Sequence, residues 1–356
     1  MKKRITALML AAMVCCGLAG CSGGSAEEKA EGEKVRYQAE FLDLFDTATQ
    51  IIFYAESEEA FNEFKELVYD NLKEYHELYD IYNDYEGISN IKTINDNAGI
   101  GPVMVDGKIM ELLLFSKEAS GISGGKVNVA FGPVLELWHD CRQTGINDPE
   151  NAELPSMEAL QAASEHTDIN SVIIDKEAST VFLESPEMSL DVGAVAKGYA
   201  VEKVCDLLAE KGYDNCLISV GGNVKAIGGK GEEGLPWNVG IQNPDTDAEE
   251  ASLYTLELKD QALVTSGDYQ RYYTVDGKKY HHIIDPETLM PSDYFRAVTI
   301  VCEDSGMADA LSTAVFNLPY EEGNTLVGLI DGAEAVWILK DGSVRFSENF
   351  QSLIHE

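Results

Sequence analysis

Residues 191–227 read DVGAVAKGYAVEKVCDLLAEKGYDNCLISVGGNVKAI, and this stretch sets the expectation for the fold. Its first half predicts a loop that enters a helix, which ends at Gly212 because glycine commonly follows a helix C-terminus. Two strands are expected next, at 217–220 and 224–227, on either side of Gly221-Gly222-Asn223. A helix followed directly by two strands indicates a chain that mixes α and β elements.

Outward from this stretch, predicted strands and helices continue in both directions without a linker-like break. Ser57 is expected to cap a long amphipathic helix, whose apolar positions recur every three or four residues up to Tyr82. A last helix is expected at about 307–318, ended by Pro319. We therefore predict a single α+β domain with two lobes over residues 37–356.

The charge balance limits the classes of partner. The 356-residue chain has 26 Lys and Arg against 62 Asp and Glu, a formal net charge of −36. Such a charge repels phosphate backbones and anionic lipid surfaces, so nucleic acid is not expected as a partner. A ligand that carries phosphates needs a divalent cation or a local basic pocket in order to approach.

The N-terminus predicts export and a lipid anchor. A basic start, Lys2-Lys3-Arg4, precedes an apolar run at 5–14 that is too short to span a bilayer. Leu18-Ala19-Gly20-Cys21 resembles a bacterial lipobox, in which the cysteine is diacylated. We expect a signal peptide at 1–20, a lipidated Cys21 with a flexible tether at 21–36, and a place outside the cytoplasm on the bacterial cell membrane. The alternative is an ordinary signal peptide with an incidental cysteine.

Four cysteines remain after the expected signal peptide and anchor: Cys141, Cys205, Cys216 and Cys302. They are widely spaced and contain no CxxC pair, so a zinc site has no support in the sequence. Export permits disulfides, but the spacing dictates no pairing. We expect these side chains to be mostly buried small hydrophobic groups.

Two glycine-containing segments are candidate ligand contacts. In Asp191–Tyr199, small residues allow close approach of the backbone, the following helix N-terminus attracts anions, and Lys197 adds a positive charge. A tight packing joint between loop and helix is the alternative for this segment. Gly221-Gly222 suggests either a hairpin turn or a flat ligand that lies against bare backbone.

A third segment, Thr265–Tyr269 followed by 280–286, contains two adjacent histidines and an aspartate. A histidine paired with a carboxylate can take a proton from a hydroxyl nucleophile, and Asp285 is placed to orient an imidazole. Neighbouring side chains on a strand face opposite ways, so only one of His281 and His282 can point into a site. The alternative is one core and one surface histidine.

A fourth segment places a carboxylate and a hydroxyl one helical turn apart. Asp309 and Thr313 are i and i+4 on the predicted last helix, so they share a face. Oxygen ligands of this kind suit Mg²⁺, which also keeps substrate phosphates in its shell. Taken alone the pair is common, and a structural role is the alternative.

Together these segments resemble the successive signatures of the FAD:protein FMN transferases, the ApbE family. The resemblance extends from about Tyr37 to Leu318 and follows the family's order. It departs early, because Phe45-Asp46-Thr47 stands where the family has Met-Gly-Thr. The matching motifs are Asp191–Tyr199, Val220–Asn223, Thr265–Tyr269, His282–Pro286 and Ala308–Thr313.

The resemblance implies a ligand cleft between the two lobes and an enzyme that uses FAD as substrate with Mg²⁺. It implies transfer of FMN to a threonine hydroxyl of an exported redox protein through a phosphoester bond, with release of AMP. The partners would be such acceptor proteins and, through the lipid anchor, the membrane. Two alternatives remain: an Mg²⁺-dependent FAD pyrophosphatase, in which water replaces threonine, and a flavin-binding lipoprotein without catalysis.

The resemblance also implies residue roles. Mg²⁺ would be held by Asp309, Thr313 and the backbone carbonyl of Ala194. His282 is the candidate base, with Asp285 beside it in the catalytic group. The residues implied to contact FAD are Tyr82, Asn128, Asp191, Lys197, Gly221, Gly222, Asp268 and Ile283.

Overall fold

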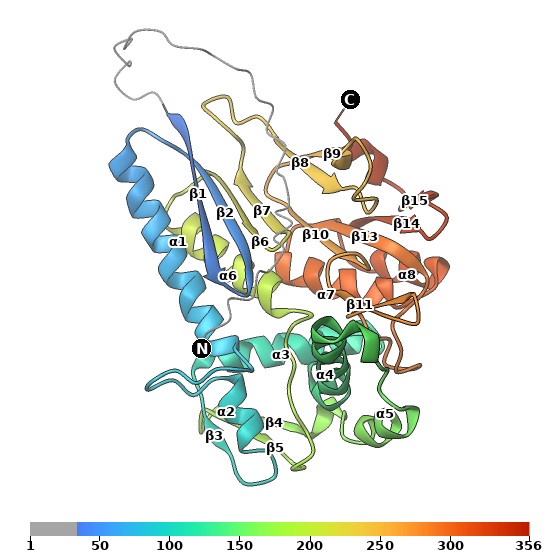
Figure 1. Cartoon of the computed structure of the whole chain (residues 1–356). Helices are drawn as coiled ribbons and strands as arrows, with labels where there is room; N and C mark the ends of the chain where they lie inside the picture. Colours follow the sequence, from blue (N-terminus) through green and yellow to red (C-terminus); the bar gives the residue numbers. More distant parts are fainter. Residues whose placement is uncertain (1–33, 356) are drawn as a thin grey trace.

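An eight-stranded sheet forms the centre of the computed structural model, which describes residues 34–355 (Figure 1). The predicted signal peptide, Cys21 and all but the end of the tether therefore lie outside the described residues. Every neighbouring pair of strands in the sheet is antiparallel. In sheet order the strands are β1 (Val35–Leu44), β2 (Thr47–Ala55), β6 (Asn215–Val220), β7 (Asn223–Gly228), β10 (Ala262–Gly267), β13 (Phe295–Cys302), β14 (Glu334–Leu339) and β15 (Val344–Phe346).

Four helices cover one face of this sheet, and a β-hairpin covers the other (Figure 1). The helices are α1 (Glu58–Tyr79), α6 (Ala196–Glu210), α7 (Ser305–Phe316) and α8 (Tyr320–Val327). The hairpin consists of β8 (Trp237–Gln242) and β9 (Ser252–Leu258), with the short helix η4 (Phe350–Leu353) beside it. Trp237, Leu256 and Phe350 from this layer are buried against the sheet.

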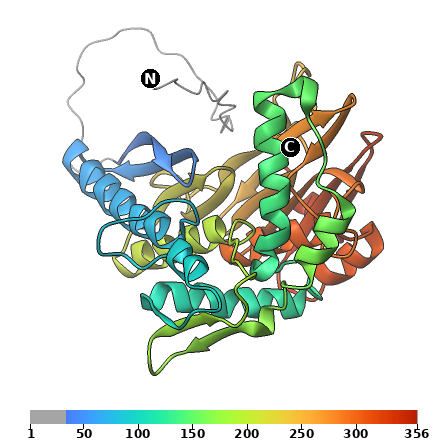
Figure 2. The same ribbon diagram turned by 60° about the horizontal axis from the view of Figure 1, so that its bottom comes forward.

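A second, mainly helical part lies below the sheet, and Figure 2 brings it forward. Buried residues of the two parts form one continuous core, which joins Ile51 of the sheet to Leu112 and Val181 below. The predicted single α+β domain is confirmed. The lower part contains α2 (Ile91–Asp96), β3 (Val103–Met104), α3 (Gly107–Ile122), η1 (Val129–Phe131), α4 (Gly132–Asn147), η2 (Pro149–Asn151), α5 (Met157–Ser164), η3 (Ile169–Ser171), β4 (Val172–Asp175), β5 (Thr180–Leu183), β11 (Tyr272–Val275) and β12 (Lys278–His281).

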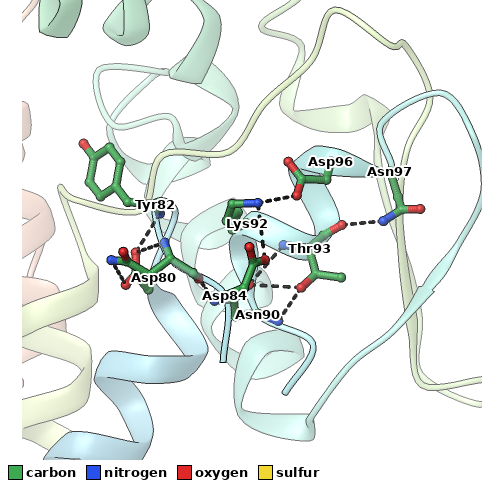
Figure 3. Close-up of polar contacts among 9 residues, drawn as sticks. Asp80, Tyr82, Asp84, Asn90, Lys92, Thr93, Asp96 and Asn97 are labelled. Atoms are coloured by element: carbon green, nitrogen blue, oxygen red, sulfur yellow. Dashed lines mark hydrogen bonds and ion pairs between the residues drawn. The ribbon is translucent and has the colours of Figure 1, made fainter. Parts of the chain in front are cut away.

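Helix α1 begins where it is expected but ends earlier. Ser57 is the N-cap and accepts a hydrogen bond from the amide of Ala60, while one face of the helix is buried. The helix ends at Tyr79, because the Asp80 carboxylate accepts the backbone N–H groups of Tyr82 and Asn83 and turns the chain (Figure 3). The prediction that the helical face continues to Tyr82 is wrong, since Tyr82 follows this turn.

The predicted last helix is also corrected. It corresponds to α7, which starts at Ser305 and ends at Phe316. It is not the last helix, because Pro319 occupies the N-cap position of a further helix, α8. Proline is tolerated at a helix start as well as after a helix end. The N–H groups of the first turn have no acceptor within the helix, so proline, which lacks an N–H, loses no hydrogen bond there.

The four described cysteines are free thiols; three are buried and Cys141 is half-buried, as expected for small hydrophobic side chains. None of the helices within residues 34–355 combines the length and the apolar character that crossing a membrane requires.

Candidate active site

Helices α6 and α7 cap each other at the centre of the candidate site. The N-cap residue of α6, Val195, provides no side-chain acceptor, and the Asp309 carboxylate of α7 instead accepts the N–H of Gly198 through Oδ2 at 2.9 Å. In return, Glu202 of α6 accepts the first N–H of α7, from Ser305, at 2.6 Å. Unpaired N–H groups and the helix dipole at each N-terminus favour a carboxylate there.

The two helices approach closely because residue 198 is glycine. A Cβ atom at Gly198 would lie 2.3 Å from the carbonyl oxygen of Ser305 and 2.5 Å from the Cβ of Asp309. The segment Asp191–Tyr199 is thus a tight packing joint, which was the alternative interpretation of its sequence. The same joint holds the Asp309 carboxylate against the helix N-terminus, so the packing role and a site role are compatible.

Asp309 is a strongly buried carboxylate with polar partners on one side. It is 5% exposed, and its Oδ2 also accepts the side-chain amide of Asn223 at 2.9 Å. Burial raises its pKa, while the charge of Lys197, whose Nζ lies 3.9 Å from Oδ2, and the two hydrogen bonds lower it. The ionised form therefore gains from any further cation that reaches it.

The predicted Mg²⁺ ligands include three oxygen atoms that are free to bind a metal ion. In the part of the chain that the structure describes, Oδ1 of Asp309, the hydroxyl of Thr313 and the carbonyl of Ala194 make no hydrogen bond. Thr313 and Ala194 are half-buried, so neither is sealed from a ligand. Residues 34–355 contain no group of three His, Cys, Asp or Glu side chains that could hold a metal. A single carboxylate with neutral oxygens fits Mg²⁺ only if a substrate phosphate and water complete its shell.

Gly221 and Gly222 form the hairpin turn between β6 and β7, one of the two interpretations of their sequence. Their φ angles of +56° and +90° belong to the left-handed region, which glycine adopts without strain. A Cβ atom at Gly221 would lie 2.6 Å from Oγ1 of Thr47, whereas one at Gly222 would meet nothing within 4 Å. The turn places Asn223 at the start of β7, where its amide reaches Asp309.

The adjacent histidines differ in how their ring nitrogens are used. His281, the last residue of β12, is buried: its Nε2 meets the carbonyl of Ser292 at 2.7 Å and its Nδ1 accepts the N–H of Ile283 at 3.2 Å. His282 lies just after the strand and is half-buried, with Nδ1 at 3.2 Å from the carbonyl of Arg271. A carbonyl only accepts, so Nδ1 of His282 carries the proton and Nε2 presents a lone pair.

The surroundings of both imidazoles favour the neutral form. Burial lowers the pKa of His281, partly offset by its bond to Ser292. Burial, followed by the positive charge of Arg271, lowers the pKa of His282 well below its usual value. A neutral His282 with a free Nε2 has the protonation state that a general base needs.

Asp285 does not orient His282, which corrects the expected pairing. Its carboxylate binds Nζ of Lys126 at 2.9 Å, and both side chains are buried. Oδ1 also accepts the N–H of Glu287, and the Glu287 carboxylate meets the same Lys126 at 3.0 Å. Burial opposes the charge on Lys126, but these partners outweigh it and raise its pKa. Asp285 and Lys126 therefore fasten the loop after His282 to the segment before η1.

Three of the predicted FAD contacts have structural partners of their own. The Asn128 amide caps η1 by accepting the N–H of Ala130 and donates to the carbonyl of Thr167. Asp268 forms an ion pair with Lys340 at 3.0 Å. Ile283 is buried in the core. Their side chains are therefore engaged in holding the fold around the site.

Tyr82 and Asp191 lie among residues that the sequence interpretation missed. Tyr82 is 59% exposed, and its hydroxyl meets Nδ1 of His139 at 3.1 Å. Burial lowers the pKa of His139, with Asp191 raising it and the charges of Arg142 and Arg271 lowering it. His139 and Arg142 are i and i+3 on α4, so their common face was the available signal. For Arg271 the only available signal was its position ten residues before the histidine pair.

Comparison with known proteins supplies a family. The chain matches the model of the ApbE family over residues 45–337. A Klebsiella pneumoniae (strain 342) protein named FAD:protein FMN transferase is 34% identical over 281 residues, covering 79% of this chain and 83% of its own. A Treponema pallidum (strain Nichols) protein of the same name is 35% identical over 272 residues, or 73% of each chain. The crystal structure of an ApbE protein from Thermotoga maritima matches with a TM-score of 0.78 and 29% identity, covering 90% of this chain and all of its own.

Proposed function

The chain belongs to the ApbE family and is a flavin transferase, and we propose that it moves FMN from FAD to a threonine hydroxyl of a partner protein. We propose further that the reaction needs Mg²⁺ and releases AMP. The observation that carries the proposal is the family match over 45–337, together with relatives named FAD:protein FMN transferase at 34% and 35% identity.

The proposed reaction breaks a phosphoanhydride bond and forms a phosphoester bond. The threonine oxygen forms a bond to the phosphorus of the FMN half of FAD, and the bond from this phosphorus to the bridging oxygen of the diphosphate breaks. The bridging oxygen leaves with AMP, and the hydroxyl proton passes to a base. Phosphoryl transfer of this kind depends chiefly on positioning and charge neutralisation.

His282 fits the base of this scheme. Its Nδ1–H is held by the carbonyl of Arg271 at 3.2 Å, which leaves Nε2 free to take the threonine proton. His281 cannot serve in the same way, because both of its ring nitrogens are engaged within the core. Water attacking in place of threonine would need the same groups, so geometry alone leaves the pyrophosphatase alternative to experiment.

Asp309, Thr313 and the carbonyl of Ala194 are the residues that would hold Mg²⁺. When bound, Mg²⁺ would neutralise phosphate charge and polarise the phosphoryl oxygens. Lys197, 3.9 Å from Asp309, brings a second positive charge to the same place. In a chain with a formal charge of −36, these cations offset the repulsion that a diphosphate meets.

We also propose export and attachment to the cell membrane through lipid on Cys21, which makes exported redox proteins the natural acceptors. The support is the lipobox-like Leu18–Cys21, followed by a short tether. Cys21→Ala should either release the protein from membranes or leave it unprocessed. Normal processing and membrane retention of Cys21→Ala would contradict this part of the proposal.

The test of the proposed function mixes the purified mature protein with FAD, Mg²⁺ and an exported flavoprotein that contains a target threonine. Covalent flavin is then read as fluorescence of the acceptor band on a denaturing gel, and AMP is measured in the same mixture. The expected result is one AMP per flavinylated acceptor, with no transfer after chelation of Mg²⁺ or to an acceptor whose threonine is changed to valine.

Two arms separate the alternatives. AMP and free FMN formed at an undiminished rate without any acceptor would indicate the pyrophosphatase. Tight FAD binding with neither AMP nor covalent flavin, across several acceptors, would indicate a flavin-binding protein without catalysis.

A further inference from the structure

Two arginines in the lower part of the molecule have no partner in the structure. Arg142 is half-buried on α4, and Arg271 is exposed and lies directly before β11. Among residues 34–355, neither guanidinium makes a hydrogen bond or an ion pair. Two other arginines do: Arg296 donates to the carbonyl of Pro244 at 2.6 Å, and Arg345 meets Glu321 at 3.5 Å.

Both arginines belong to the surroundings of His282. The carbonyl of Arg271 accepts the backbone N–H of His282 at 3.1 Å and meets its Nδ1 at 3.2 Å. Helix α4, which carries Arg142, packs against β11, whose first residue follows Arg271. After burial, the charges of Arg271 and Arg142 are among the causes that lower the pKa of His282.

The surroundings of Arg142 disfavour its charge. Burial, and then the like charge of Arg271, lower the pKa of Arg142. Asp191 is near enough to oppose this effect, yet its Oδ1 accepts the N–H of Gly193 and it makes no ion pair among the described residues. Two guanidinium groups without an ion pair among the described residues, in a chain of charge −36, would gain from a phosphate, which their planar donor sets match.

We propose that Arg142 and Arg271 form an anion-binding pair that holds a phosphate group of FAD beside His282. This inference rests on the proposed function. The choice of phosphate follows from the reaction: the attacked phosphorus must lie next to the hydroxyl whose proton His282 takes. The phosphate oxygens therefore occupy the space that the two arginines border. The cations at Asp309 and the arginine pair would then share the charge of the diphosphate.

The test measures ligand binding without any acceptor protein. Arg142→Gln, Arg271→Gln and the double variant are titrated with FAD in the presence of Mg²⁺, and with riboflavin, which has the same ring but no phosphate. Each single change should weaken FAD binding by about 10- to 100-fold, the effect of losing a hydrogen bond to a charged group. Riboflavin binding should not change. Arg345→Gln, on the exposed strand β15, is the matched control and should bind FAD normally.

Thermal unfolding provides a second readout. Because neither guanidinium makes a hydrogen bond or an ion pair among the described residues, the variants should unfold close to the wild-type temperature without ligand and show a smaller rise in that temperature on addition of FAD. Equal weakening of FAD and riboflavin would overturn the proposal, since it would indicate general damage. Unchanged FAD binding with a raised KM for the acceptor would also overturn it, because the pair would then bind the acceptor. Failure of the wild type to transfer FMN would count against the proposed function alone.

Discussion

Asp309 and His282 belong to two parts of the candidate site that are built differently. The metal side, named for the proposed Mg²⁺ site, consists of Asp309, Thr313, Ala194 and Lys197 on α7 and at the start of α6, and its carboxylate is fixed by two hydrogen bonds of 2.9 Å. The base side, formed by Tyr82, His139, Arg142, Arg271 and His282, depends on turns and on one face of α4.

The two sides are therefore expected to have different roles in the reaction. Groups on the metal side are rigidly placed by helix N-termini, which suits a fixed position for Mg²⁺ and diphosphate. Both sides keep polar groups without a hydrogen bond among the described residues: Oδ1 of Asp309 on the metal side, and Nε2 of His282 and two guanidinium groups on the base side. Such free groups are what a metal ion, a reacting hydroxyl and a phosphate need, so changes to them are expected to affect transfer more than folding.

The largest effect is expected from the metal side. Asp309→Asn should lower transfer by more than ~100-fold, because even changes in the second layer around a metal cost ~10–100-fold. Its free energy of unfolding should stay within ~1 kcal/mol of the wild type, since an amide is easier to bury than a carboxylate. Steady-state transfer and urea unfolding test both values. Asp206→Asn, at an exposed position on α6, is the control. An equal loss of transfer activity in both variants would contradict the assignment of Asp309 to the site.

The next largest effect is expected on stability, at the buried ion pair between Lys126 and Asp285 that fastens the loop after His282. Asp285→Asn removes the buried partner of Lys126 and should cost ~1–3 kcal/mol of unfolding free energy. Glu287→Gln removes the other partner of the same lysine, but this carboxylate is 75% exposed, so less than ~1 kcal/mol is expected. Urea unfolding of both variants decides. Equal losses of unfolding free energy in the two variants would show that the burial of Asp285 does not strengthen its ion pair with Lys126.

The free energy of unfolding should decrease as the pH falls, because of the buried His281. The folded-state pKa of His281 is lowered by burial, whereas the unfolded chain takes up its proton near pH 6.5. Stability is therefore complete above that pH and is lost as the pH falls towards the folded pKa. Between pH 7.5 and 5.5, wild type should lose of order 1 kcal/mol more than His281→Gln. A larger loss in the variant would contradict the direction.

The smallest effect is expected at the turn that carries Tyr82. Asn90 caps α2 and donates to the carbonyl of Asn83 at 2.9 Å, which steadies the turn (Figure 3). Asn90→Ala should cost ~1 kcal/mol and reduce transfer only slightly. Lys92→Ala, which removes exposed ion pairs of the same helix, should cost less. Thermal unfolding compares the two, and the reverse order would be inconsistent with this assignment.

Local patterns in the sequence were enough for much of the fold and for the placement of Asp309 and Thr313 on one helix. Gly212, the Gly221-Gly222 turn and the Asp309–Thr313 spacing each act within a few residues, so periodicity and turn chemistry predict them. The end of α1 was missed because the Asp80 carboxylate, not the apolar pattern, stops the helix.

The base side could not be predicted in the same way because it is assembled over long range. Lys126 meets Asp285 across 159 residues, and Tyr82 meets His139 across 57. Asp285 lies three residues after His282 in sequence, which suggested a pairing, but in the structure its carboxylate binds the buried Lys126. Sequence proximity therefore misassigned a partner that only the packed structure identifies.

The central claim is that His282, not His281, takes the proton in transfer, while other residues provide the affinity for FAD. Single-turnover transfer with saturating FAD and Mg²⁺, measured per folded molecule, tests it most directly. His282→Ala should transfer ~10²–10⁴-fold more slowly with nearly unchanged FAD affinity. His281→Ala should be less stable but transfer at close to the wild-type rate. If His281→Ala is the slower of the two, the assignment of the base is contradicted.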